Sequence, residues 1–137
     1  MTLTDPLPGP AAADPDGPPE WTDVCAFDAL QPDLGVCALV GGVAVAIFRC
    51  WPDDDLYALA NIDPFSDASV LSRGIVGSIG DAPVVASPIF KNRFDLRTGV
   101  AIDDPSTRVA VYDVLVIDGR VLVSAHPIPV AGALATP

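Results

Sequence analysis

The sequence has few basic residues and no long uninterrupted apolar run. Seven Lys and Arg stand against 18 Asp and Glu among 137 residues, for a formal net charge of −11 and an isoelectric point near 4.1. Nucleic-acid binding uses clustered basic side chains against phosphates, so we expect no nucleic-acid partner. Asp, Gly or Pro interrupts each apolar run before the roughly 18 to 20 residues that a membrane-spanning helix needs, so no membrane segment is expected.

The patterns of metal sites, disulfide frameworks and secretory signals are also missing. The three cysteines, Cys25, Cys37 and Cys50, are odd in number and widely spaced among apolar neighbours, so we predict reduced core residues. The only histidine is His126, which excludes a His-rich metal site. Residues 1–20 hold no base and no apolar segment typical of a secretory signal, so a cytoplasmic protein is expected.

Composition divides the chain into three parts. Residues 1–20 hold six of the 15 prolines, and such a segment buries too little apolar area to offset its ordering entropy, so a disordered arm is predicted. Residues 127–137 repeat this composition, and we expect a flexible tail. The remaining residues, 21–126, form one domain, and 50% hydrophobic residues in the chain are enough to give it a core.

The sequence of this domain predicts short β-strands. Two hairpins are predicted, one over residues 36–50 around Gly41-Gly42 and one over 109–125 around Asp118-Gly119, because these dipeptides suit two-residue turns. Short strands are expected at 56–60, 83–87 and 93–96, and helical turns only at 25–30 and 68–72. The fold class is therefore all-β, a small antiparallel sandwich or barrel.

Two phrases between the hairpins resemble the cluster-binding loops of a Rieske domain. They are Asn61-Ile62-Asp63-Pro64-Phe65 and Ser87-Pro88-Ile89-Phe90-Lys91, the second followed by Phe94-Asp95-Leu96-Arg97-Thr98-Gly99. The resemblance puts Asn61, Asp63, Ser87 and Phe90 where a Rieske domain has its Cys and His ligands. A Rieske centre needs two thiolates and two imidazoles. We therefore expect a Rieske-like fold whose cluster-binding-like subdomain holds no cluster or other metal.

This combination is similar to the small subunits of assimilatory NAD(P)H-dependent nitrite reductases. The resemblance covers residues 21 to about 125 and implies an accessory subunit without its own cofactor or catalytic residues. Reduction of nitrite to ammonium would then belong to a large partner subunit that carries sirohaem, an iron–sulfur cluster, FAD and the NAD(P)H site. The alternative is a cluster-less Rieske-like interaction module of another oxidoreductase system.

The distribution of charge suggests where a partner docks. Residues 1–72 hold 12 acids and one base, whereas residues 73–137 hold six of each. Four of these bases would flank the two loops of a Rieske fold, so we predict a basic docking surface there, against the alternative of merely solvated charges. The bases are Arg73, Lys91, Arg93 and Arg97. Phe65 and Phe90 are predicted either to fill the volume of the missing cluster or to join the docking surface.

The remaining sequence motifs give weaker indications of function. The run Asp53-Asp54-Asp55 lacks the alternating carboxylates, the Gly and the closing Glu of an EF-hand loop, so a solvated turn is expected. Ser87 and Ser124 have no nucleophile-elbow context around them, so no catalytic triad is expected.

Overall fold

The computed structural model describes residues 21–128, so the predicted arm 1–20 and most of the predicted tail lie outside the described residues. Six strands form one antiparallel sheet in the order β1-β11-β10-β4-β3-β2. They are β1 (Trp21–Ala26), β2 (Gly35–Val40), β3 (Val43–Cys50), β4 (Asp55–Ala60), β10 (Val111–Ile117) and β11 (Arg120–Pro127). A 3₁₀ turn, η1 (Phe27–Ala29), joins β1 to the first hairpin.

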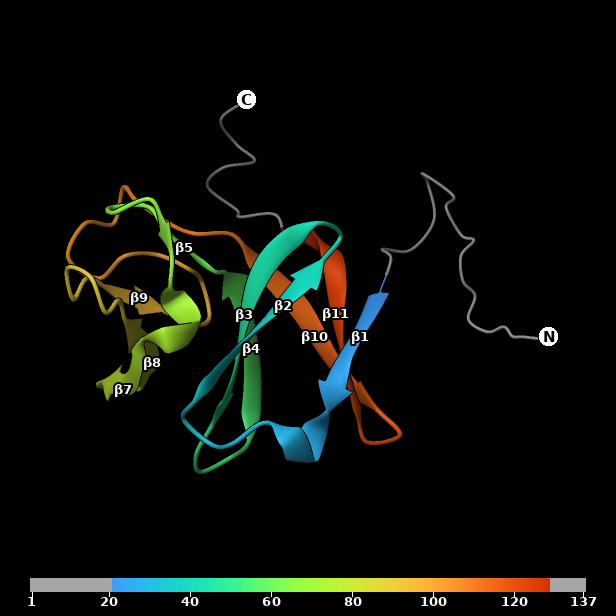
Figure 1. The fold of residues 1–137 in the computed structure, drawn as a ribbon. Helices are drawn as coiled ribbons and strands as arrows, with labels where there is room; N and C mark the ends of the chain where they lie inside the picture. Colours follow the sequence, from blue (N-terminus) through green and yellow to red (C-terminus); the bar gives the residue numbers. More distant parts are fainter. Residues whose placement is uncertain (1–20, 129–137) are drawn as a thin grey trace.

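The large sheet curls until its two edge strands approach one another. Residues of β1 and β2 come within contact distance, and so do residues of β2 and β11. A Cβ atom on Gly41, in the turn after β2, would lie 3.2 Å from Ala125 Cβ on β11. The sheet is therefore a nearly closed small barrel, seen from the side in Figure 1.

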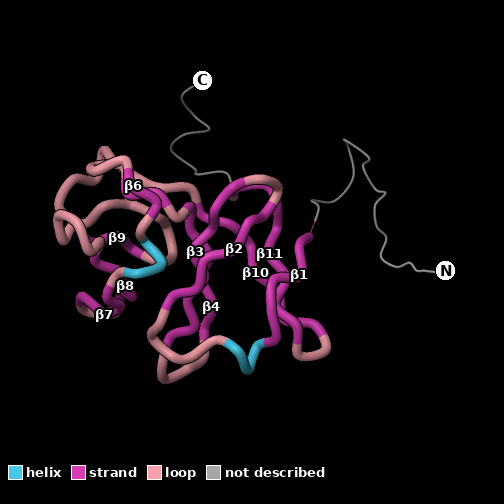
Figure 2. The backbone as a smooth tube through the Cα atoms, in the orientation of Figure 1, coloured by secondary structure: helices cyan, strands magenta, loops and turns pink. Residues whose placement is uncertain are grey.

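A second subdomain is inserted between β4 and β10 and lies on one side of the barrel (Figures 1 and 2). It consists of a two-stranded sheet, a 3₁₀ turn and a three-stranded sheet in the order β7-β8-β9. Its elements are β5 (Ile62–Asp63), β6 (Ala68–Ser69), η2 (Leu71–Arg73), β7 (Ile75–Ile79), β8 (Ala82–Ala86) and β9 (Arg93–Asp95). Both phrases that resemble Rieske loops lie in this subdomain, and the predicted all-β fold class is confirmed.

Both predicted hairpins are present. Gly41 and Gly42 have φ values of 58° and 84°, and Asp118 and Gly119 have 52° and 78°, the positive values that a type I′ turn requires. The strands predicted at 56–60, 83–87 and 93–96 are β4, β8 and β9, each within one residue at either end.

Several elements differ from the sequence prediction. Cys25 and Ala26 belong to strand β1, so the turn predicted over 25–30 is reduced to Phe27–Ala29. The turn predicted over 68–72 is divided between β6 and η2. Both β1 and β7 were missed, because β1 is a half-buried edge strand and β7 contains Gly77 and Ser78, which have low β-propensity. The sheet also continues through Pro127, and the Ile128 amide donates to the Val111 carbonyl over 2.7 Å.

Strand β3 is the wall between the two parts of the core. Because side chains alternate along a strand, Ala46 and Phe48 point toward the inserted subdomain, whereas Val45 and Ile47 point into the barrel. All four are fully buried. Phe48 meets Phe94 of β9 in the cluster that ties the subdomain to the barrel. The subdomain is thus packed on a rigid base and not attached by its connections alone.

The cysteines lie at three different depths. Cys50 is buried, Cys25 is half-buried and Cys37 is exposed, and all three are free thiols. The prediction of core cysteines is therefore right for Cys50 and wrong for Cys37. The reason is register, since Val36, Ala38 and Val40 of β2 face the barrel interior and place Cys37 on the outer face.

Candidate functional site

A buried hydrogen bond joins the two loops that resemble the Rieske loops. Ser87 Oγ, just after β8, donates to Asp63 Oδ2 in β5 over 2.5 Å, and neither residue has any solvent exposure. The other carboxylate oxygen, Asp63 Oδ1, accepts the Phe65 amide over 2.8 Å. Charge-assisted bonds of this kind are short and strong. The Asp63–Ser87 pair therefore cross-links two loops that lie 24 residues apart in the chain.

Asn61 organises the first loop and not the contact between loops. Its side-chain oxygen accepts the Ser72 amide over 2.7 Å, and its side-chain nitrogen donates to Ser69 Oγ over 2.9 Å. Its backbone carbonyl accepts the Leu71 amide over 2.9 Å. With 3% exposure, Asn61 fixes η2 against the end of β4.

The second loop is a tight turn that points its apolar side chains outward. The Lys91 amide donates to the Ser87 carbonyl over 3.0 Å, and the Ile89 amide donates to Ser87 Oγ over 3.2 Å. Lys91 has a φ of 65°, a left-handed conformation that few non-glycine residues adopt. In this turn Ile89 is 45% exposed and Phe90 63% exposed.

The two phenylalanines have different roles. Phe65 is half-buried against the core, with its ring centroid 6.0 Å from that of Phe94 at a tilt of 40°. Phe65 thus packs against the core, which favours the interpretation of Phe65 as an apolar filler. Phe90 packs outward on the loop and leaves an aromatic ring in solvent.

Of the four predicted docking bases, two form ion pairs within the subdomain. Arg93 Nη2 lies 3.1 Å from Asp103 Oδ1, and Arg97 Nη2 lies 3.0 Å from Asp95 Oδ2. Arg73 and Lys91 are exposed and have no ion pair within residues 21–128. The positive charge left at the loops is therefore that of Arg73 and Lys91.

The residues that the resemblance places at the Rieske ligand positions do not fit an iron–sulfur cluster. They supply no thiolate and no imidazole, the Asp63 carboxylate is already bonded on both oxygens, and Phe90 has no donor atom. Across the part of the chain that the structure describes, no group of three or more His, Cys, Asp or Glu residues is arranged to hold a metal ion. In the same residues, no helix is long and apolar enough to cross a membrane.

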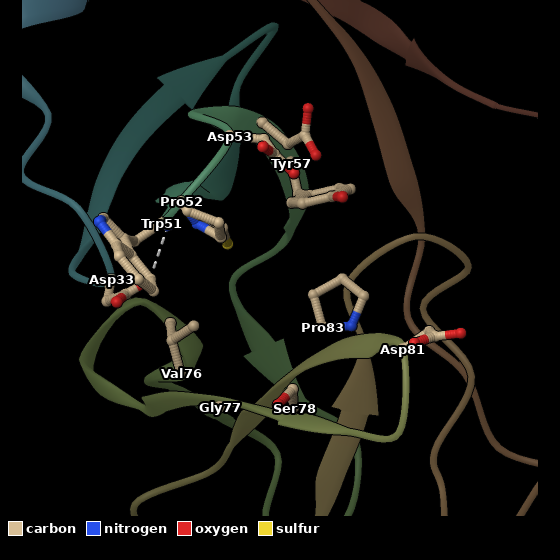
Figure 3. A pocket seen from close by; sticks show the side chains of 12 residues that line it. Asp33, Trp51, Pro52, Asp53, Tyr57, Val76, Gly77, Ser78, Asp81 and Pro83 are labelled. Atoms are coloured by element: carbon tan, nitrogen blue, oxygen red, sulfur yellow. Dashed lines mark hydrogen bonds between the residues drawn. The ribbon is translucent and has the colours of Figure 1, made fainter.

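A groove that the sequence did not reveal lies where the barrel meets the subdomain. Its cavity volume is about 430 Å³, and it opens between the β3–β4 turn and the β7–β8 hairpin (Figure 3). Trp51, at its edge, is 72% exposed. Aromatic, apolar and acidic residues share the lining; they include Trp51, Pro52, Tyr57, Val76 and Pro83 together with Asp33, Asp53, Asp55 and Asp81. A turn reading Trp-Pro-Asp-Asp-Asp was the only sequence signal for it.

Burial and nearby carboxylates raise the pKa of two groups in this groove, Cys50 and Tyr57. Burial, with the charges of Asp33 and Asp55, raises the pKa of the Cys50 thiol to about 11. Burial and the neighbouring Asp55 also raise the pKa of Tyr57. Arg97 lies close enough to Tyr57 and Asp81 for their charges to add to that of Asp95 in raising its pKa. Arg97 itself is not among the residues that line the groove.

Known proteins match the chain over nearly all of the described residues. The Rieske-like [2Fe–2S] domain family matches residues 20–124. The NADH nitrite reductase small subunit of Salmonella typhimurium is 46% identical over 102 residues, which are 74% of this chain and 94% of that protein. The crystal structure of a putative NADH-dependent nitrite reductase small subunit from Mycobacterium tuberculosis is 43% identical with a TM-score of 0.76, and the match covers 83% of this chain and all of that one.

A third relative is built differently. The NAD(P)H nitrite reductase large subunit of Klebsiella oxytoca is 40% identical over 103 residues, which are 75% of this chain but 11% of that protein. There the same domain is one part of a much longer polypeptide. Together with the fold and the loop geometry, these matches show that the chain belongs to the Rieske-like [2Fe–2S] domain family, among the small subunits of nitrite reductase.

Proposed function

We propose that this chain is the accessory small subunit of an NAD(P)H-dependent nitrite reductase and that it acts by docking on the large subunit without a redox centre of its own. One observation carries the accessory role. The four positions that would ligate an iron–sulfur cluster hold Asn61, Asp63, Ser87 and Phe90, and a serine–aspartate hydrogen bond joins the loops in place of a metal.

The reaction chemistry is then assigned to the partner. Reduction of nitrite to ammonium takes six electrons, so the large subunit would carry sirohaem, an iron–sulfur cluster, FAD and the NAD(P)H site. The Klebsiella oxytoca large subunit, which contains a homologous domain within its own chain, supports this partnership. Three free thiols in one small domain support a location in the reducing cytoplasm.

We place the docking surface at the exposed ends of the two loops. This surface, called the docking tip below, consists of Arg73, Ile89, Phe90 and Lys91. An exposed aromatic ring beside uncompensated positive charge is the composition of an interface centre and its rim. Arg93, Arg97 and Phe65, also predicted to bind the partner, are occupied by ion pairs or by the core and contribute less.

The alternative, a cluster-less module of another oxidoreductase system, has less support. Its proposed relatives, the ferredoxin components of oxygenases, carry electrons through their cluster. The loop residues of this chain cannot ligate one, so a ferredoxin-like role would lose the chemistry that defines it.

Co-expression with a large subunit tests the proposal. We expect the purified chain to be colourless and iron-free, to co-purify with the large subunit, and to raise the rate of NAD(P)H-dependent nitrite reduction over that of the large subunit alone. Bound iron in the purified chain would contradict the assignment of the loops. A chain that neither associates with the large subunit nor changes its rate would contradict the accessory role.

A further inference from the structure

The groove between the barrel and the subdomain has the composition of a binding surface for a basic segment. Trp51, Pro52, Tyr57 and Pro83 line it, and Trp51, at its edge, leaves 72% of its surface in solvent. In Figure 3 the upper wall is formed by the β3–β4 turn and the lower wall by the β7–β8 hairpin. An exposed tryptophan in a concave site is a frequent interface anchor.

Carboxylates surround these aromatic groups on both walls. Asp53 comes from the β3–β4 turn, Asp55 is the first residue of β4, and Asp81 comes from the β7–β8 turn. None of the three accepts a side-chain ion pair from within residues 21–128, whereas Asp54, which points elsewhere, pairs with Arg49 over 2.9 Å. The aromatic faces attract cations, and the free carboxylates add charge complementarity.

The charge of the chain itself argues against filling the groove from within. Residues 1–20 contain four acids and no base, and residues 129–137 contain no charged side chain. Neither of these segments carries a basic side chain, so neither offers charge complementarity to an acidic groove. The occupant therefore comes from another molecule and carries positive charge.

The groove and the docking tip lie at opposite ends of one strand. Pro83 of β8 lines the groove, and Ser87 follows the other end of β8 at the loops. Pro83 and Ser87 are four residue steps apart, which in an extended strand is a distance of about 13 Å. A single large partner can reach both surfaces, and the partner already proposed for the tip is available for the groove.

We infer that the groove binds an extended segment of the large nitrite reductase subunit that places an arginine or lysine side chain over Trp51 and between Asp53, Asp55 and Asp81. This assignment rests on the proposed function for the identity of the partner. It adds a second contact surface of opposite charge to the docking tip, so the partner would present acidic groups to the tip and basic groups to the groove.

The test compares two triple variants of equal charge. The groove variant carries Asp53→Asn, Asp55→Asn and Asp81→Asn, and the control carries Asp28→Asn, Asp113→Asn and Asp118→Asn, all exposed positions that do not line the groove. We expect the groove variant to weaken binding to the purified large subunit by about tenfold and to lose much of the salt dependence. The control is expected to stay within about twofold. Trp51→Ala should weaken binding as well, and Trp51→Phe should retain most of it.

Carboxyl footprinting locates the contact independently of mutation. The complex is treated with a carbodiimide and glycine ethyl ester, and labelling is measured by mass spectrometry. We expect protection of Asp53, Asp55 and Asp81 on binding and unchanged labelling of Asp113 and Asp118. Equal binding of the groove variant and its control, or unprotected groove carboxylates, would overturn the inference.

Failure of the proposed function and failure of the groove assignment give different results. If the unaltered chain does not bind the large subunit at all, the proposed function itself fails. If light scattering shows that the chain self-associates and that only the groove variant abolishes this, the occupant is a second copy and the large-subunit assignment is overturned.

Discussion

Ser87 Oγ and Asp63 Oδ2 lie 2.5 Å apart and are fully buried, and the resemblance to Rieske domains places both residues at positions of cluster ligands. The pair takes one residue from each loop, so it joins the loops as the cluster would. A hydrogen bond of this kind positions the loops but carries no electrons. In the proposed function, the geometry of the fold is retained without a redox centre in this chain.

Removal of this bond should destabilise the domain. We expect Ser87→Ala to lower the free energy of unfolding by about 1–3 kcal/mol, because it leaves the buried Asp63 carboxylate short of a donor. Ser106→Ala is the matched control, since Ser106 Oγ donates to Asp104 Oδ1 over 2.6 Å on an exposed loop. That change should cost less than about 0.5 kcal/mol. Urea unfolding measures the free energy of unfolding of both variants. Equal decreases would show that the buried Asp63–Ser87 bond stabilises the domain no more than the exposed one.

The exposed ring of Phe90 should matter for association and not for folding. We expect Phe90→Asp to weaken binding to the large subunit at least tenfold while the free energy of unfolding changes by less than about 0.5 kcal/mol. Leu39→Asp is the control, because Leu39 is 70% exposed on β2 and is not a residue of the docking tip. Calorimetric titration with the large subunit measures both. Undiminished binding of Phe90→Asp would remove the docking tip from the proposal.

Two glycines of the inserted subdomain should respond in opposite ways to alanine. A Cβ atom on Gly74 would lie 2.4 Å from the Ala86 carbonyl oxygen, so Gly74→Ala forces η2 away from β8 and should cost about 1–3 kcal/mol. Gly77 has open space around it and no positive φ. Gly77→Ala should be neutral or slightly stabilising. Thermal unfolding distinguishes them, and similar melting temperatures would contradict the close packing of η2 on β8.

Acid should weaken the subdomain through Asp95. Partial burial raises the pKa of this carboxyl, but hydrogen bonds and charge from Arg97 outweigh burial and hold it below its ordinary value of 3.8. A carboxyl with a lowered folded pKa adds stability above its unfolded pKa and loses it as pH falls through the folded value. Arg97→Gln should therefore lose less stability than the unaltered chain below about pH 4. Urea unfolding between pH 6 and 2.5 measures it, and parallel curves would contradict the coupling.

The three thiols should react in order of exposure. Cys37 is exposed, Cys25 is half-buried with a pKa raised mainly by burial, and burial and neighbouring carboxylates raise the pKa of Cys50 to about 11. The thiolate is the reactive form. With iodoacetamide at pH 8 we expect Cys37 to be alkylated first and Cys50 only after unfolding, as followed by mass spectrometry. Early alkylation of Cys50 would show that the groove opens in solution.

The sequence alone determined the all-β architecture and supplied the prediction that the loops hold no cluster. Turn dipeptides such as Gly41-Gly42 and Asp118-Gly119 specify their hairpins locally, because only residues tolerant of positive φ fit such turns. The prediction of no cluster rests on the identity of the loop residues, since ligation depends on the donor atoms that a side chain has. The resemblance to nitrite reductase small subunits rested on the same loop phrases.

Tertiary structure decided which of these residues meet and which remain accessible. Nothing local pairs Ser87 with Asp63 across 24 residues, packs Phe65 against the core while exposing Phe90, or pairs Arg93 with Asp103. The groove itself arises where a turn of the barrel faces a hairpin of the subdomain. Such contacts depend on packing between segments distant in the chain, and their energies are not written in any short stretch of sequence.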